Sequence, residues 1–398
     1  MKNRSSLVLI FLTVFIDLLG FGILIPILPS FSVKELHVDE AAIGIAIAIY
    51  SFVQFLFNPV LGKLSDKYGR KPVIVVCLFL NAMGYIVFAF THSYLMLLVS
   101  RVIAGIGGSS IGVAQAYIAD VTTRENRSKG MGLIGAAFGL GFVFGPLIGG
   151  LLSSYGYAVT GYVAAGFSFI AFILTIFYLP ESLKQKEESE NLSAHPQRRK
   201  LFDFAAMKKI LQKPDLAVLI LLFFILTFSF ANIYGTFALL GLKVYGFTDM
   251  QNGYMYGIVG LSSAIIQGGL IGRINKLMSK KMILSIGSIL MMFSLAMIPY
   301  AGTFLGLAIV SIVLSYGTGT FQPTVLSLIS EVTSESEQGI TLGINQSLSS
   351  FARVLGPLWG GFAFEYLGYP FPFLTGAVFT FIIFLLTVFY LPKKIKLD

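Results

Sequence analysis

One acidic residue, Asp17, lies near the middle of a long apolar stretch, residues 7–29. About twenty apolar residues span a bilayer as a helix, so Asp17 is expected near the middle of a membrane. A carboxylate at that depth is costly unless it is protonated, paired or in contact with water. Every other Asp and Glu falls in a loop, in the C-terminal tail or at the end of a predicted span. If protons drive this protein, Asp17 is the leading candidate to carry them.

A cation, Arg101, lies in the apolar segment 94–119. Counting 1.5 Å per residue places it about 10 Å below the outer surface and Asp17 about 16 Å below it. An Arg side chain covers most of that gap, so we expect Arg101 close to Asp17. A nearby guanidinium favours the ionised carboxylate and apolar surroundings favour the neutral acid, an opposition that suits a releasable proton. The alternative is a structural Arg that donates to carbonyls of the first helix.

The composition is that of a polytopic membrane protein. Of 398 residues, 56% are hydrophobic and 12% are charged, with a mean hydropathy of +0.83. Soluble domains carry roughly 25% charged residues. The single cysteine, Cys77, lies in an apolar run and excludes disulfides and cysteine metal sites. The first apolar run is too long for a signal peptide and has no small-residue cleavage site after it, so we expect an uncleaved helix.

The apolar segments predict twelve transmembrane helices and both termini on the same side. Only Lys34 and Lys243, among the 28 Lys and Arg, lie in loops on the opposite side from the termini, which predicts cytoplasmic termini and a net charge of +9 concentrated at the inner face. The segments are 6–29, 41–62, 72–91, 94–119, 129–153, 158–179, 215–241, 250–272, 282–300, 303–329, 339–363 and 370–391.

The fold class expected is therefore an all-α polytopic membrane protein. Residues 1–180 would form an N-terminal six-helix bundle and residues 215–398 a C-terminal one. The polar segment 181–214 would be a cytoplasmic linker that begins flexible and ends in a short interfacial helix at 201–211.

The two halves repeat in the same orientation. Residues 119–122 align with 330–333, 145–150 with 356–361, and 174–180 with 386–392. Such a repeat implies a pseudo-two-fold axis along the membrane normal and a solute pathway between the halves. Because channels also contain repeats, this pattern alone does not specify the mechanism.

The loop after the second segment, residues 62–71, reads Gly-Lys-Leu-Ser-Asp-Lys-Tyr-Gly-Arg-Lys. It resembles the cytoplasmic signature of the major facilitator superfamily, Gly-x-Leu-Ala-Asp-Arg-x-Gly-Arg-Lys. The glycines would permit a tight turn and close helix approach. The resemblance implies a conformational latch in which Asp66 caps a helix of the other half and Arg70 pairs with an acid at the end of helix 4, here Asp120. The latch set is Gly62, Asp66, Gly69, Arg70 and Asp120; the alternative is a solvated charged loop.

Two further segments resemble motifs of the same superfamily. Arg101 with Gly105 and Gly107 is similar to a helix 4 motif associated with proton coupling. Helix 5 is similar to an antiporter signature, of which the residues are Gly141, Gly145, Pro146, Gly149 and Gly150. Its copy at 356–361 indicates that part of the pattern serves helix packing.

Across the whole chain, the combination with the helix 1 string at 17–29 most resembles the tetracycline-efflux branch of the twelve-helix drug:proton antiporters. Those exporters carry further membrane acids in helices 3 and 9. Here the helix 3 region has Asn81 and helix 9 has no acid, which makes tetracycline a doubtful substrate.

By analogy with the family, helices 1, 4, 7 and 10 line a central cavity. Each cavity candidate is equally well explained as an interhelical hydrogen bond or a core aromatic. Arg353, a second cation within a span, would suit an anionic head group or substrate. The candidates are Gln54, Gln115, Phe228, Asn232, Tyr256, Gln322, Asn345 and Arg353.

The resemblance thus implies a monomeric proton-coupled antiporter that exports small amphipathic molecules by alternating access. It would have the proton gradient in place of a cofactor, the cell membrane as its location, and no nucleic-acid partner. The rival is an exporter or flippase of the same fold for a lipid or an endogenous metabolite. An enzyme is disfavoured because the sequence has no nucleotide-binding loop, no metal-spaced His or Cys cluster and no Ser/His/Asp set. A receptor would need an extramembrane domain, and no loop is large enough.

Overall fold

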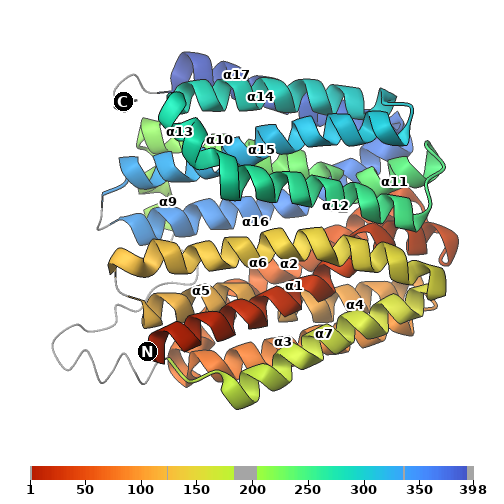
Figure 1. The fold of residues 1–398 in the computed structure, drawn as a ribbon, viewed down its shortest axis with the longest axis horizontal. Coiled ribbons are helices and arrows are strands. Elements are labelled where there is room, and N and C mark those ends of the chain that lie inside the picture. Colours follow the sequence, from red (N-terminus) through yellow and green to blue (C-terminus); the bar gives the residue numbers. More distant parts are fainter. Residues whose placement is uncertain (1, 123, 183–203, 335–336, 392–398) are drawn as a thin grey trace. The chain divides into compact units, whose positions relative to one another are not determined.

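A computed structural model of the chain describes residues 2–122, 124–182, 204–334 and 337–391 (Figure 1). Within these ranges every regular element is helical, and the contacts divide the chain into two units. Unit 1 comprises Met1–His37 and Ile49–Leu201, and unit 2 comprises Val38–Ala48 and Phe202–Asp398. The first turns of the second helix therefore group with the C-terminal helices, a detail that the repeat in the sequence does not reveal.

Unit 1 is built from long apolar helices joined by short turns. They are α1 (Lys2–Lys34), α2 (Glu40–Tyr68, whose first turns belong to unit 2), α3 (Arg70–Ala89), α4 (Tyr94–Gly107), α5 (Ser110–Val121), α6 (Arg124–Leu152) and α7 (Tyr157–Tyr178).

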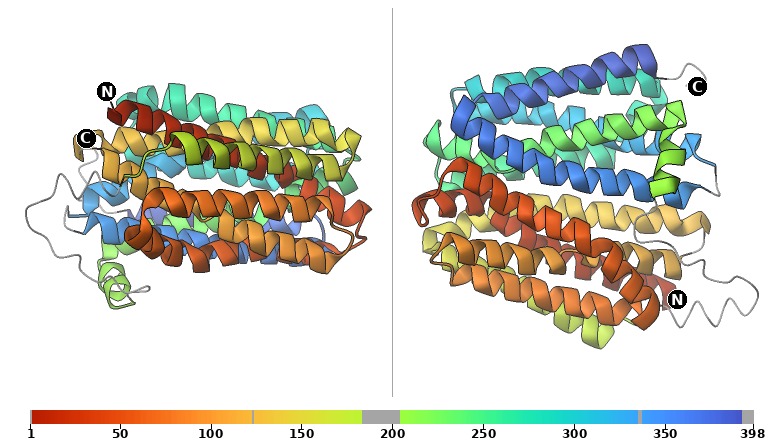
Figure 2. Two further views of the ribbon diagram at one scale, coloured as in Figure 1. Left: turned by 90° about the horizontal axis from the view of Figure 1, so that it is seen from below. Right: turned by 180° about the vertical axis from the view of Figure 1, so that it is seen from behind.

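Unit 2 repeats this plan after a short helix. Its helices are α9 (Phe204–Leu211), α10 (Pro214–Ile233), α11 (Thr236–Lys243), α12 (Asp249–Ile265), α13 (Ile271–Leu277), α14 (Lys280–Met297), α15 (Phe304–Val332), α16 (Gln338–Phe362) and α17 (Phe371–Tyr390). Within each unit the long helices run nearly parallel or antiparallel in every view (Figure 2).

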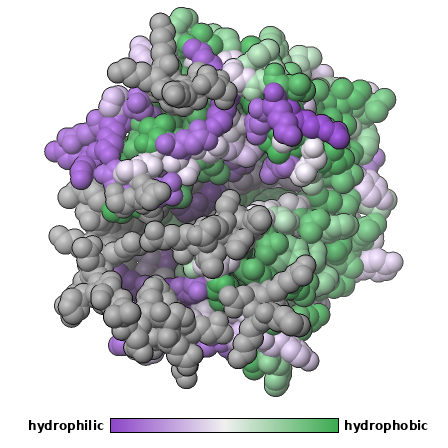
Figure 3. Space-filling view, turned by 60° about the vertical axis from the view of Figure 1, so that its left-hand side comes forward, coloured by the Kyte–Doolittle hydropathy of each residue, from purple (hydrophilic) through white to green (hydrophobic). Residues whose placement is uncertain are grey.

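The structure confirms an all-α membrane fold. Among the described residues, eleven helical segments are long and apolar enough to cross a membrane. The eleventh predicted segment, 339–363, coincides with α16, which has 25 residues and a more polar sequence. On the face shown in Figure 3, hydrophobic side chains cover the flank of the helices and hydrophilic ones gather toward the helix ends. That distribution fits helices embedded in lipid.

Two predicted spans are broken helices. The span predicted at 94–119 consists of α4 and α5, which are separated at Gly108 and Ser109. The span predicted at 215–241 consists of α10 and α11, which are separated at Tyr234 and Gly235. Broken helices in membrane proteins occur where the surrounding protein satisfies the freed backbone groups.

The repeat is visible in matched side-chain contacts. Lys71 Nζ donates to the carbonyl of Ile176 at 2.7 Å, and Lys281 Nζ donates to the carbonyl of Val388 at 2.8 Å. Ile176 and Val388 occupy equivalent positions in the aligned repeats. In each unit a lysine at the start of one helix thus covers the exposed carbonyls at the end of the last helix.

The predicted linker lies mostly outside the described residues, since 183–203 is not described. The final part of the linker is described. It contains α9 (Phe204–Leu211), close to the short helix expected at 201–211, and α9 packs against α10 and α16.

Candidate functional site

Asp17 lies midway along α1 with 5% of its surface exposed. Its carboxylate accepts hydrogen bonds from three other helices. Asn81 Nδ2 of α3 lies 2.9 Å from Oδ1 and 3.1 Å from Oδ2. Ser168 Oγ of α7 donates to Oδ1 at 3.0 Å, and Ser110 Oγ of α5 approaches Oδ2 at 3.4 Å. Unit 1 therefore surrounds one buried carboxylate with donors suited to its ionised form.

The expected contact between Arg101 and Asp17 is not formed. Arg101 is 4% exposed, its Nε lies 3.3 Å from Ser100 Oγ, and its guanidinium carbon lies 5.5 Å from the ring centroid of Phe88. Its Nη2 has no hydrogen-bond partner among the described residues. A depth count carries no information on direction: the side chain turns toward the ring of Phe88, where a cation–π contact takes the place of the expected ion pair.

The side chain of Tyr85 on α3 interacts electrostatically with both Asp17 and Arg101. A charge on either Asp17 or Arg101 acts on its phenol. Its ring packs against α1 one turn beyond Asp17, because a Cβ on Gly20 would lie 3.1 Å from Cε2 of Tyr85. The Tyr85 hydroxyl is buried and has no hydrogen-bond partner among the described residues.

The glycines of the antiporter-like motif, predicted in the fifth span, lie on α6 and place it directly against α1 beside Asp17. A Cβ on Gly141 would lie 2.8 Å from Cβ of Leu18, and a Cβ on Gly145 would lie 2.6 Å from Cα of Gly22. Gly149 faces the backbone of Ile23 in the same way. Gly141, Gly145 and Gly149 therefore allow two helix backbones to touch. Pro146 and Gly150, the other two residues of the predicted motif, lie within α6.

The copy of this pattern in α16 packs in the corresponding way in unit 2. A Cβ on Gly356 would lie 2.6 Å from Cβ of Ala231 on α10, the first long helix of that unit. Packing is thus a role that both copies share, as the repeat in the sequence indicated.

The predicted latch residues form an ion cluster at one end of unit 1. Arg70 Nη1 lies 2.6 Å from Asp66 Oδ1 and 2.6 Å from Ser65 Oγ, and Arg70 Nε lies 2.9 Å from Asp120 Oδ2. The Arg70 and Asp120 side chains are 9% and 6% exposed. A planar guanidinium can serve two carboxylates at once, which a lysine ammonium cannot do with the same geometry. The predicted pairing of Arg70 with Asp120 is present.

Glu181 completes this cluster from the end of α7. One carboxylate oxygen accepts the backbone N–H of Arg70 at 2.9 Å and the other accepts that of Lys71 at 3.1 Å. It thereby caps the first turn of α3, where free N–H groups and the helix dipole favour an anion. Ser182 Oγ in turn donates to Asp120 Oδ2 at 3.2 Å.

Only one of the two glycines expected to serve the turn does so. Gly69 has φ of 105°, a conformation that L side chains rarely adopt, and it faces the Glu181 carboxylate. Gly62 lies inside α2, and a Cβ there would meet nothing within 4 Å. The expectation for Gly62 was wrong because α2 continues to Tyr68, so the turn begins later than the motif suggested.

Unit 2 retains part of this cluster. Lys280, at the start of α14, pairs with Glu331 at the end of α15. Glu331 aligns with Asp120 in the repeat, and the lysine replaces the arginine of unit 1. Their side chains are 29% and 45% exposed, so this pair is solvated where its counterpart is buried.

Most of the predicted cavity residues have partners in their own unit. Gln54 Nε2 donates to the Gly108 carbonyl at 2.8 Å, Tyr256 Oη donates to the Tyr234 carbonyl at 2.7 Å, and Asn232 Nδ2 donates to the Pro372 carbonyl. Phe228 contacts Phe379 edge-on, with ring centroids 5.2 Å apart. These four residues hold helices together, as their alternative interpretation proposed.

The other candidates differ in exposure. Asn345 is 3% exposed, Gln115 and Arg353 are half-buried, and Gln322 is exposed. Arg353 Nη2 donates to Ser350 Oγ at 3.0 Å and the guanidinium is near enough to Tyr234 to act on it electrostatically.

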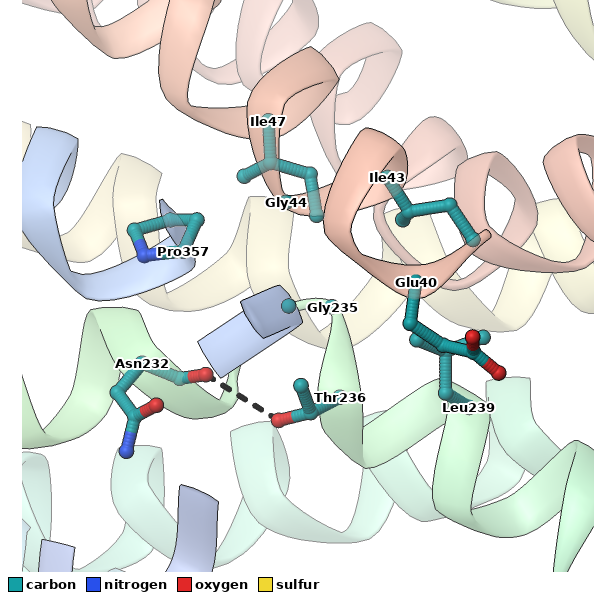
Figure 4. A pocket seen from close by; sticks show the side chains of 10 residues that line it. Glu40, Ile43, Gly44, Ile47, Asn232, Gly235, Thr236, Leu239 and Pro357 are labelled. Carbon is teal, nitrogen blue, oxygen red and sulfur yellow. Dashed lines mark hydrogen bonds between the residues drawn. The ribbon is translucent and has the colours of Figure 1, made fainter. Parts of the chain in front are cut away.

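A small cavity of about 10 Å³ lies in unit 2 (Figure 4). Glu40, Ile43, Gly44 and Ile47 of α2 line one side of it, and Asn232 and Thr236 are among the residues opposite. Glu40 pairs with Lys243, and its backbone N–H donates to Glu365 Oε2 at 3.1 Å. This volume holds about one water molecule, so the cavity is too small for an organic substrate.

Sequence reasoning missed the partners of Asp17 and the role of Glu181. Asn81 was noted only as a departure from the tetracycline exporters, and Ser110 and Ser168 were not singled out. Polar residues in apolar segments are the signal that could have found them. Across residues 2–122, 124–182, 204–334 and 337–391, no group of three or more His, Cys, Asp or Glu could hold a metal ion.

Comparison with protein families gives one match across nearly the whole chain. A family model described as "Major Facilitator Superfamily" matches residues 10–278 and 265–397.

Individual relatives include drug resistance proteins and a transporter of known structure. The chain is 29% identical over 378 residues to multidrug resistance protein 2 of Bacillus subtilis (strain 168), covering 94% of this chain and 92% of that one. It is 29% identical over 361 residues to the class C tetracycline resistance protein of Escherichia coli, covering 90% and 89%. It is also similar to the crystal structure of the human organic anion transporter MFSD10 (TETRAN), with a TM-score of 0.71, 25% identity, and 97% and 100% coverage.

Proposed function

Since this chain belongs to the major facilitator superfamily, we propose that it is a proton-coupled antiporter that exports small amphipathic molecules across the cell membrane. The observation that carries the proposal is the single carboxylate of Asp17, buried midway along α1 and held by side chains of α3, α5 and α7. Relatives that share 29% of its residues are multidrug and tetracycline resistance proteins, which supports export of drug-like compounds.

The chemistry follows from the two protonation states of Asp17. As a carboxylate it accepts every hydrogen bond offered by Asn81, Ser110 and Ser168. When it binds a proton, one acceptor becomes a donor and the network must rearrange. Because these donors come from three helices, proton binding changes what holds α1 in place within its unit.

Coupling to transport then requires that the two protonation states favour different arrangements of the protein. A proton binds Asp17 on the outer side, is released on the inner side, and exchanges there for substrate. The cluster of Arg70, Asp66 and Asp120 acts as the cytoplasmic latch in this cycle. Both termini are cytoplasmic in this proposal, in agreement with the distribution of Lys and Arg.

A second substrate class, an amphipathic anion such as a lipid or an endogenous metabolite, is favoured by Arg353. It is a half-buried cation on α16, within the predicted span 339–363. A relative of 25% identity is an organic anion transporter, which supports the same class. A cation in a span is functional by default because it is costly to keep there.

Everted membrane vesicles that contain the protein distinguish these classes. We expect an imposed pH gradient, acid inside, to drive uptake of lipophilic cations by wild type and by Arg353→Gln alike if the substrates are cationic drugs. Uptake of amphipathic anions that is lost in Arg353→Gln would favour the second class. Absence of gradient-driven uptake of either kind would contradict proton-coupled export.

A further inference from the structure

In the carboxamide of Asn81, the nitrogen is hydrogen-bonded and, within the described part of the chain, the oxygen is not. Its Nδ2 lies 2.9 Å and 3.1 Å from the two oxygens of Asp17, nearly centred on the carboxylate. Its Oδ1 is buried and has no hydrogen-bond partner among the described residues. Asn81 itself is 2% exposed, so bulk water does not satisfy that oxygen. A buried carbonyl without a partner is unfavourable and calls for a reason.

The surroundings fix the direction of the free oxygen. It faces Gly107, where α4 ends, since a Cβ on Gly107 would lie 2.7 Å from Asn81 Oδ1 and 2.7 Å from the Cys77 carbonyl. A carbonyl acceptor therefore lies on the same side as Oδ1. If the amide turned over, Nδ2 would face that side and Oδ1 would face Asp17.

We propose that Asn81 is the positioning residue of the proton site, and that its amide serves both states of Asp17 by turning over. It donates through Nδ2 to the carboxylate and accepts through Oδ1 from the carboxylic acid. This inference rests on the proposed role of Asp17 as the proton-binding group.

The step is a simple protonation. A proton from the adjoining aqueous phase adds to one oxygen of Asp17, one O–H bond forms, and the negative charge is neutralised. The new O–H would point at a donor if Nδ2 stayed in place, so the amide turns and Oδ1 accepts it. Loss of the proton reverses both changes.

Among the described residues, no titratable side chain is hydrogen-bonded to Asp17. Cys77 and Tyr85 of α3 interact with its charge, and Arg101 of α4 lies against Phe88. Ser168 and Ser110 are the rival acceptors, because a hydroxyl can both donate and accept. In the structure Ser168 donates to Oδ1 of Asp17 at 3.0 Å and Ser110 approaches Oδ2 at 3.4 Å.

Infrared difference spectra of the full-length protein in lipid nanodiscs, taken between high and low pH, test this assignment. The carbonyl band of protonated Asp17 is identified by its loss in Asp17→Asn. In Asn81→Leu, which is similar in size, we expect this band to move to the frequency of an acid whose O–H has no acceptor. We also expect the pH of half-protonation to rise, because the charge-assisted bond lost from the carboxylate is stronger than the neutral bond lost from the acid. Ser168→Ala is the comparison variant: it removes a donor to Oδ1 of Asp17, and its band should still be that of an acid whose O–H has an acceptor.

A measurement on the wild-type sequence covers the case in which Asn81→Leu does not fold. With ¹³C-labelled asparagine, a pH-dependent shift of an amide carbonyl band should appear and should vanish in Asp17→Asn. Absence of that shift, or a band that follows Ser168→Ala and ignores Asn81→Leu, would overturn the proposal. These spectra need no substrate, so Asn81 can pass this test even if transport proves independent of protons.

Discussion

At the scale of single residues, Asp17 shows how a membrane protein can hold a carboxylate without a cation beside it. Hydrogen bonds to a charged group contribute about 1.5–3 kcal/mol each. Asn81 and Ser168 supply such bonds at 2.9–3.1 Å. Arg101 meanwhile rests on the ring of Phe88. Asp17 and Arg101, which their similar depth in the sequence suggested as a pair, are thus stabilised separately.

Gly69 offers a test of the latch at one position. In Gly69→Ala, the new Cβ would be held at φ of 105° and pressed toward Glu181, which caps α3. We expect a loss of about 1–3 kcal/mol of stability, seen as a lower Tm of the detergent-solubilised protein.

Gly62→Ala is the matched control for that variant. Gly62 belongs to the same motif, but its Cβ would meet nothing within 4 Å inside α2. Alanine there should be neutral or stabilising by up to about 1 kcal/mol. Equal losses of Tm in the two variants would contradict the distinct role given to Gly69.

At the scale of elements, the contact between α1 and α6 brings two helix backbones together beside Asp17. In Gly145→Ala the added methyl group would lie 2.6 Å from Cα of Gly22, and backbone atoms cannot move aside as a side chain can. We expect a destabilisation of about 1–3 kcal/mol, measured by thermal unfolding. Gly139→Ala on the same helix, with nothing within 4 Å, should not lower Tm; a comparable loss there would show that α6 tolerates no alanine for other reasons.

The ion pair of Lys213, between α9 and α10, with Glu337, at the start of α16, should depend on pH. Lys213 Nζ lies 2.5 Å from Glu337 Oε2, and this bond, followed by one from Ser334, lowers the pKa of Glu337 from its usual 4.5. A carboxyl with a lowered pKa stabilises the fold fully above its ordinary value, and that contribution is lost as pH falls through the lowered one.

Lys213→Met should therefore lower Tm at pH 7, and its difference from wild type should shrink below about pH 4.5. Because the pair is exposed to solvent, we expect a small effect that high salt weakens further. Lys208→Met, an exposed lysine of α9, is the control and should show no such trend. A Tm difference that persists unchanged into acid would exclude Glu337 as the partner responsible.

The helices themselves were predictable from the sequence because apolar runs of spanning length leave few alternatives in a membrane. The breaks at Gly108 and Tyr234 were not predictable. A helix can break where nearby protein satisfies the freed backbone groups, and an apolar run does not reveal that protein. α2 likewise continues past Gly62 and ends directly before Gly69, whose positive φ forms the turn.

At the scale of the whole molecule, the family and the repeat followed from motifs spread along the chain, and a family model across residues 10–278 and 265–397 confirmed the family. The polar residues of the apolar segments were visible in the sequence, but which of them meet Asp17 depends on how α3, α5 and α7 rotate about their axes. A single sequence gives the depth of a residue but not the direction in which its helix faces. Arg101 illustrates the difference, since its counted depth suited Asp17 but its side chain turns to Phe88.

Proton release from proteoliposomes on addition of substrate tests the central claim most directly, with wild type and Asp17→Asn compared under the same pH gradient. Wild type should release protons when lipophilic cations or amphipathic anions are added, and the variant should bind substrate but release none. Substrate-driven release that survives in Asp17→Asn would contradict the assignment of Asp17 as the proton carrier.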